Sequence, residues 1–190
     1  MMKLKVLAVV VVIAAAAAFF ALQGPETVEE VHEHADFLVV IYGVPYNFSQ
    51  EKYMTTAERS LSSFAHLHDT NGNIIHKHAR GVTLGFFFRT LGMKFNSTCL
   101  EMDDGSAYCS NKNAQMKVYV NGRQNSLYDR YEFEDLDRIL VVYGDETPEE
   151  IRTLGESITS DACIYSLKCP ERGTPPDEAT CVGSCVLEEL

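Results

Sequence analysis

The stretch FAHLHDTNGNIIHKH, residues 64–78, predicts a β-hairpin. Its centre, Asp69-Thr70-Asn71-Gly72, fits a type I turn with Asp first and Gly fourth, within a three-residue loop that ends in a G1 bulge. This turn sets His66 opposite His76 and puts four histidines on one face. A two-residue turn at Asn71-Gly72 would shift the pairing by one residue and divide those histidines between two faces. Turn preferences favour the first register, so the sequence predicts a shared histidine face.

Every histidine of the chain belongs to a His-x-His pair. Side chains two apart in a strand project from the same face, about 6.5–7 Å apart along the strand. Imidazole suits zinc, copper and nickel. The sequence therefore predicts a site for a divalent transition metal, copper or zinc, whose candidate ligands are His32, His34, His66, His68, His76 and His78.

The identity of the metal stays open at this point. The affinity order of imidazole sites favours copper(II), whereas tetrahedral geometry and availability favour zinc. The carboxylates of Asp36 and Asp69 could add ligands or accept hydrogen bonds from the rings, although Asp69 also has the character of a simple turn residue.

Other interpretations of the histidines remain. They could be polar residues on the solvent face of a sheet, in a cell-envelope interaction module whose cysteine-rich tail meets a partner. A metal-dependent enzyme with Glu33 as base is a further alternative, but Glu33 should point to the opposite face of its strand from His32 and His34. Since no nucleophile elbow, phosphate loop or glycosidase-like carboxylate pair is present, no catalytic residue and no organic cofactor is assigned.

The N-terminal residues predict export. Lys3 and Lys5 precede the apolar run VLAVVVVIAAAAAFFAL, residues 6–22. The pattern predicts a membrane segment over residues 4–22, with a cytoplasmic N-terminus and an outward C-terminal domain. An uncleaved anchor is favoured over a cleaved signal that would release a secreted protein. Residues 24–31 would form an acidic stalk. The net charge of −11 argues against nucleic acid as a partner.

Export also predicts disulfides, because the cysteines would lie in an oxidising compartment. The pair Cys99 and Cys109 should clasp a hairpin. The tail cysteines should pair among themselves, with three connectivities open, and are Cys163, Cys169, Cys181 and Cys185.

The remaining pattern predicts an α+β domain. Residues 49–63 read as a loop that could hold a short helix at 56–61. A covering helix should begin after Thr83 as N-cap and end at Gly92, and a second should follow the Thr147 capping box as far as about Ser157. Strands are expected at 32–42, 44–48, 116–120 and 138–143.

The order of hairpin, helix and the closing segment KVYVNGRQ…YEFEDLDRILVVYG resembles a β-grasp (ubiquitin-like) domain, in which a helix crosses a mixed sheet. Residues 131–144 are similar to the ending of sulfur-carrier β-grasp proteins. The expected helix is short, however, and Asp145 follows Gly144 in place of a terminal Gly-Gly. Sulfur-carrier activity is therefore not implied.

A second resemblance covers residues 31–144 and rests on HEHADF, FSQEKYM, HLHDTNGNIIHKHARGVTLG and LDRILVVYG. These motifs resemble uncharacterised exported His-x-His proteins of archaea and candidate-phylum bacteria, which implies no activity. The expected organisation is a membrane anchor or signal (1–23), a stalk (24–31), a β-grasp-like domain (32–144), and a helix with a disulfide-rich tail (145–190).

Overall fold

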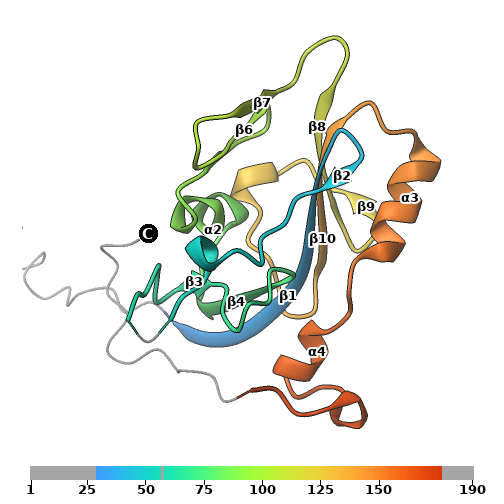
Figure 1. Ribbon diagram of the computed structural model, residues 1–190. Coiled ribbons are helices and arrows are strands. Elements are labelled where there is room, and N and C mark those ends of the chain that lie inside the picture. The colour runs from blue at the N-terminus through green and yellow to red at the C-terminus, as the bar shows by residue number, and fades with distance from the viewer. Residues whose placement is uncertain (1–28, 57, 177–190) are drawn as a thin grey trace, which may run out of the picture.

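A mixed β-sheet forms the centre of the protein (Figure 1). The computed structural model describes residues 29–56 and 58–176. Within them the strands of this sheet run in the order β3-β4-β1-β10-β8-β9, with β2 paired to β1. The bounds are β1 Glu30–Ile41, β2 Val44–Pro45, β3 Ala65–His66, β4 Ile74–Ala79, β8 Gln115–Val120, β9 Arg123–Gln124 and β10 Arg138–Gly144.

The two central strands, β1 and β10, are parallel, and each is flanked by an antiparallel neighbour, β4 and β8 respectively. β10 is buried nearly throughout, as its run of branched apolar residues predicts. The predicted strand over 44–48 is wrong beyond its first two residues. Pro45 lacks a backbone N–H and so limits strand pairing at this position.

Helix α2 (Leu84–Thr90) covers one face of the sheet and closes the main core. The Thr83 hydroxyl accepts a hydrogen bond from Phe86 N, and Gly92 follows the C-cap with φ of +76°, so both predicted helix boundaries are confirmed. Phe87 packs edge-on against Phe37 of β1, with ring centroids 5.3 Å apart. This face is the apolar side of β1, β4, β8 and β10.

Helices α3 (Pro148–Ser157) and α4 (Ala162–Tyr165) lie on the opposite side of the sheet from α2 (Figure 1). The predicted capping box of α3 is present, formed by Thr147 and Glu150. Ile151 and Ile158 pack in a smaller core with Val40, Leu140 and Val142. α4 contacts β1, and its N-terminal end is held by Asp36, whose carboxylate accepts hydrogen bonds from Thr159 Oγ1, Asp161 N and Ala162 N.

A small second sheet lies beside α2, with the strand order β5-β6-β7. The strands are β5 Lys94–Phe95, β6 Cys99–Glu101 and β7 Ala107–Cys109. The expected disulfide between Cys99 and Cys109 joins β6 to β7, and a second disulfide joins Cys163 to Cys169 across the end of α4. Cys181, Cys185 and the apolar run over residues 4–22 lie outside the described residues.

Three short 3-10 helices complete the described chain: Glu51–Tyr53, Tyr128–Arg130 and Pro170–Arg172. The short helix expected within 56–61 does not form in the described part of that segment. A turn of 3-10 helix at Glu51–Tyr53 precedes it instead and buries Tyr53.

The hairpin register is as predicted, but the turn chemistry is different. His66 pairs with His76. The left-handed residues are Asp69 and Thr70, with φ of +56° and +58°, and Asn71 N donates to His68 O at 3.0 Å. Positive φ at both central residues belongs to a type I′ turn, so the predicted type I turn with a G1 bulge at Gly72 is wrong. Gly72 is instead required by a close approach, since a Cβ there would lie 2.3 Å from Ser49 N.

Candidate metal centre

Strand alternation places the histidines on the face of the sheet opposite to α2. In β4, Ile75, Lys77 and Ala79 face the main core, so His76 and His78 face the other way. The buried Lys77 amino group donates to Glu33 Oε2 at 2.9 Å and to Phe133 O at 2.7 Å. Glu33 therefore lies on the α2 side, as predicted, and does not adjoin the histidines.

The pairing of β1, β4 and β3 brings all three His-x-His pairs together. His34 of β1 and His66 of β3 both pair with His76, which lies between them in β4. The six rings form one connected group with centroid separations of 3.8–5.9 Å. The His32/His34 pair therefore lies beside the hairpin, as one site with all six candidate ligands requires. We call this group the histidine grid; its members are His32, His34, His66, His68, His76 and His78.

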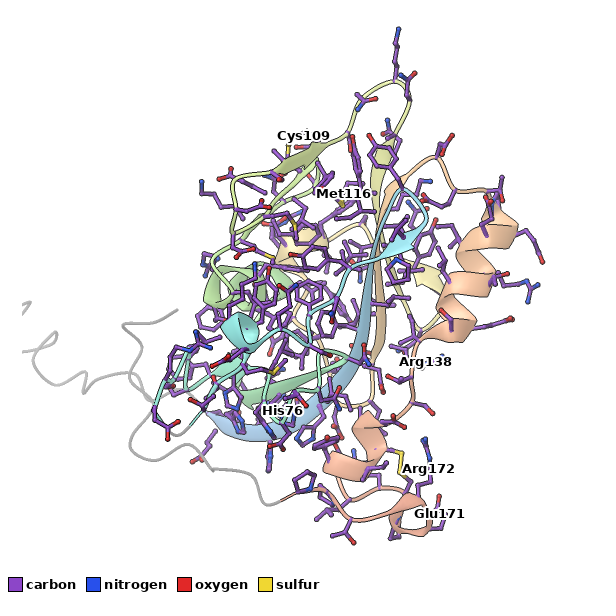
Figure 2. The ribbon with its side chains drawn as sticks, in the orientation of Figure 1. His76, Cys109, Met116, Arg138, Glu171 and Arg172 are labelled. Atoms are coloured by element: carbon purple, nitrogen blue, oxygen red, sulfur yellow. A yellow bond between two sulfur atoms is a disulfide. The ribbon has the colours of Figure 1, made fainter. Side chains whose placement is uncertain are left out.

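The histidine grid is largely buried, unlike the solvent-facing histidines of the alternative interpretation. His32 is exposed and His68 is half-buried, whereas the exposed fraction is 7% or less for His34, His66, His76 and His78. Part of the cover comes from α4, because the Tyr165 ring lies 5.0 Å from the His76 ring and 5.7 Å from the His34 ring. Figure 2 shows the labelled His76 side chain near α4.

A chain of hydrogen bonds orients His34. Its Nδ1 atom lies 2.8 Å from Ser166 Oγ, which donates in turn to Asp135 Oδ1 at 2.5 Å. The Lys168 amino group contacts the second oxygen of Asp135. Burial raises the pKa of the Asp135 carboxyl, but the hydrogen bonds from Lys168 and Ser166 outweigh burial and hold the pKa below its ordinary value. Since the Ser166 hydroxyl donates its hydrogen bond to this carboxylate, its oxygen accepts from the Nδ1–H group of His34.

Two further histidines are oriented in the same way. His66 Nδ1 lies 3.0 Å from Ser62 O, and His68 Nδ1 lies 2.7 Å from Asp69 Oδ2. A carbonyl and a carboxylate only accept hydrogen bonds, so each Nδ1 carries the proton. In the neutral ring the lone pair then lies on Nε2. Metal-ligating histidines commonly have this arrangement, in which an oxygen acceptor fixes the tautomer and the ring orientation.

One pair of rings is joined by a hydrogen bond whose length is close to the spacing of two ligands on one ion. His68 Nε2 lies 3.1 Å from His76 Nδ1, and since His68 carries its proton on Nδ1, His76 Nδ1–H donates to His68 Nε2. Two nitrogens that each bind zinc at ~2.0–2.1 Å with a tetrahedral angle lie about 3.3 Å apart. Among the side chains that the structure describes, no group of three or more His, Cys, Asp or Glu residues is arranged to hold a metal ion. Recruitment of a third ligand therefore requires rings to turn.

The carboxylates considered from the sequence take different roles. Asp69 is both a turn residue and the acceptor for His68. Asp36 anchors α4 through its hydrogen bonds and is not directed to a ring in the described contacts. Sequence reasoning did not single out Ser62, Tyr165, Ser166 or Asp135. The one available signal was the short Cys163–Cys169 interval, which encloses Tyr165 and Ser166.

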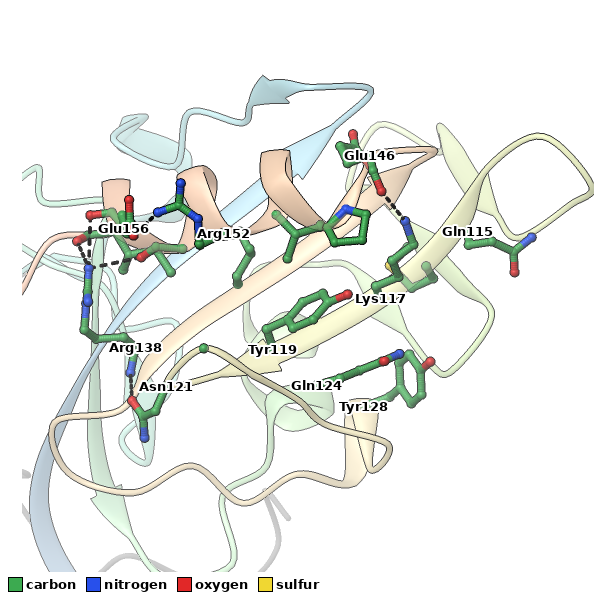
Figure 3. Close-up of a pocket in the computed structure, with 17 residues that line it drawn as sticks. Gln115, Lys117, Tyr119, Asn121, Gln124, Tyr128, Arg138, Glu146, Arg152 and Glu156 are labelled. Carbon is green, nitrogen blue, oxygen red and sulfur yellow. Dashed lines mark hydrogen bonds and ion pairs between the residues drawn. The ribbon is translucent and has the colours of Figure 1, made fainter.

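A separate pocket lies between α3 and the β8–β9 edge of the sheet (Figure 3). Its volume is about 740 Å³, and Tyr119, Leu140 and Ile151 line it. Arg138 closes one end by donating to backbone carbonyls at the end of α3, including Gly155 O at 3.1 Å. No histidine lines this pocket, so it is distinct from the histidine grid.

Comparisons with known proteins give no assignment: no family model, no curated protein and no solved structure matches the chain. Within residues 29–56 and 58–176, no helix has both the length and the apolar character needed to cross a membrane.

Proposed function

We propose that this chain is a membrane-anchored protein, with its folded domain outside the cytoplasm, that binds a divalent transition metal through the histidine grid. The metal is copper or zinc. Residues 4–22 of the sequence support the anchor, and the grid supports the metal. The function would be to capture or buffer the ion at the cell surface.

We also propose that the sheet and α2 form a β-grasp-like core. The strand order β4-β1-β10-β8-β9, the parallel central pair and the helix that follows β4 support this. The β-grasp-like arrangement matters for the metal site because it makes β1 and β4 neighbouring strands. Their histidine pairs can then face one another across the sheet.

The observation that carries the metal proposal is the common orientation of three rings. His34, His66 and His68 each direct Nδ1 toward an oxygen atom: Ser166 Oγ, Ser62 O and Asp69 Oδ2 respectively. An oxygen acceptor at Nδ1 leaves Nε2 as the ring nitrogen that can bind a metal, so the Nε2 atoms of these three rings are the candidate ligand atoms.

The test is a titration of the full-length chain, purified in detergent without a polyhistidine tag. We expect the metal-free protein to bind copper(II) and zinc(II) at pH 7.5 by isothermal titration calorimetry. His68→Ala combined with His76→Ala removes the two nitrogens that lie 3.1 Å apart. This variant should lose at least about 100-fold in affinity at the tightest site, since two ligands are lost.

A control variant separates lost ligands from general damage. Gln124→Ala alters an exposed side chain on β9, at the other edge of the sheet, and should bind metal as the wild type does. Circular dichroism checks that the double variant is folded, and His68→Ala alone serves if it is not, because His68 is less buried than His76. No binding by the wild type would overturn the proposal and favour the envelope interaction module.

A further inference from the structure

The histidine grid can be grouped about the two histidines of β4 into two rows of three rings; the rows adjoin each other, since the ring centroids of His32 and His34 lie 4.8 Å apart. In the first row His76 lies between His34 and His68, with ring centroids 4.7 and 3.8 Å away. We call it the α4 row, because Tyr165 of α4 contacts all three rings. In the second row His78 lies between His32 and His66, at 5.1 and 5.0 Å. We call this the distal row.

Each row draws one histidine from each His-x-His pair. β4 supplies the central ring in both rows, β1 supplies one flank, and the β3 side of the hairpin supplies the other. The side chains of the β3 side lean along the sheet, since His66 opposes His76 in register while its ring is nearer to that of His78. The repeat of two along each strand thus produces two sets of three imidazoles that come from the same three strand segments.

A single ion would not use all six histidines. Zinc in proteins takes about four ligands, and copper(II) sites of imidazoles also take about four strong ones. One ion would therefore leave at least two of the six histidines without a role in binding. Two ions would use all six, with three imidazoles and one further coordination position each.

From this division we infer that the histidine grid is a two-ion site, with one divalent transition metal in the α4 row and a second in the distal row. The inference rests on the proposed function, because it assumes that the histidines bind metal. It adds a second site, formed by His32, His66 and His78, and a stoichiometry of two.

The two sites should differ in affinity. In the α4 row, His34 is oriented through Ser166 and His68 through Asp69. In the distal row, His66 is oriented by Ser62 O, and His32 is exposed to solvent. Two divalent cations in neighbouring rows also repel each other, so the second ion should bind about 10- to 100-fold more weakly than the first. The α4 row should fill first.

The experiment measures stoichiometry on the full-length protein in detergent, without a tag. Equilibrium dialysis against zinc(II), followed by elemental analysis, should give two zinc ions per chain for the wild type. His32→Ala combined with His78→Ala should give one, and so should His34→Ala combined with His68→Ala. Gln124→Ala should keep two. Because His32 is exposed, His32→Ala alone remains usable if a double variant does not fold, and it should weaken only the second binding step, by at least ~10-fold.

The possible results distinguish failure of the two-ion site from failure of metal binding itself. One ion per wild-type chain at saturating zinc would overturn the two-ion site and leave metal binding intact. No bound ion would overturn both. Two ions in the His32→Ala/His78→Ala variant would place the second ion elsewhere and would also overturn the distal row.

Discussion

The Nδ1 atom of His34 lies 2.8 Å from the Oγ atom of Ser166, a residue 132 positions further along the chain. This contact joins the first strand of the sheet to the segment that follows α4. The contact also determines the tautomer of His34. The Ser166 hydroxyl donates its hydrogen bond to Asp135, so its oxygen accepts from His34 and fixes which nitrogen of His34 carries hydrogen.

Ser166→Ala should therefore weaken metal binding without unfolding the protein. The variant removes the acceptor for His34 Nδ1–H, and loss of such a partner costs about 10- to 100-fold in metal affinity. Competition with a chromophoric chelator measures the change. Ser157→Ala is the matched control, since Ser157 is exposed on α3 and donates to Leu154 O instead. Equal affinities of the two variants would show that the Ser166 contact does not prepare a ligand.

The local elements of the fold were predictable from the sequence because their signals are local. Thr83 and Gly92 mark the ends of α2, and the Thr147 capping box starts α3. The register of the histidine hairpin was also predictable, even though its turn was not. Asp69 and Thr70 take the left-handed conformation, and no short-range preference of threonine indicates this.

The surroundings of the histidines could not be predicted in the same way. Ser62 and Ser166 orient rings through contacts that depend on the packing of loops and of α4 against the sheet. The burial of His76 likewise depends on Tyr165, which is 89 residues away in the sequence. Strand periodicity predicts the face of the sheet from which a side chain projects, but it does not predict which residues cover that face.

Asp103 should make the stability of the fold depend on pH. Its carboxylate accepts hydrogen bonds from Lys52 Nζ and Tyr53 Oη, both at 2.6 Å, and these hold the pKa of Asp103 below its ordinary value. Because the folded-state pKa is lowered, the contribution is complete above the unfolded value of about 3.9 and is lost as pH falls through the folded-state pKa.

Asp103→Asn should accordingly be less stable than the wild type at pH 7, by about 1 kcal/mol, the net value of a typical hydrogen bond. The difference should shrink as pH falls below about 3.9. Urea denaturation at several pH values measures it. Asp145→Asn, at an exposed position, should show no such difference at neutral pH. A gap between Asp103→Asn and wild type that stays constant with pH would refute the role assigned to the carboxylate.

Gly72→Ala should destabilise the fold because the added methyl group has no space. The new Cβ would lie 2.3 Å from Ser49 N and 2.4 Å from Phe48 C, both backbone atoms. We expect a loss of about 1–3 kcal/mol, as for other overpacked sites. Gly155→Ala is the control, since a Cβ within α3 would meet nothing within 4 Å. That variant should gain about 0.5–1 kcal/mol from the helix propensity of alanine. Thermal unfolding of both variants tests the contrast.

The Cys163–Cys169 disulfide should support metal binding from a distance. It encloses Tyr165 and Ser166, which contact His34, and Lys168, which contacts Asp135. Replacing both cysteines with serine frees this short loop and removes about 2 kcal/mol of stabilisation. Metal affinity should fall by ~10-fold, because Ser166 would hold His34 less firmly.

The Cys99–Cys109 disulfide provides the comparison that makes this prediction specific. It joins β6 to β7 in the small second sheet and contacts none of the histidines in the described structure. Its removal should lower stability to a similar extent and leave metal affinity unchanged. Chemical denaturation and chelator competition, run on both double variants, separate stability from affinity. A drop in affinity of equal size in the two variants would indicate general loosening of the fold. A loss of metal affinity only in the Cys163→Ser/Cys169→Ser variant would show that the loop supports binding through its contacts with His34 and Asp135.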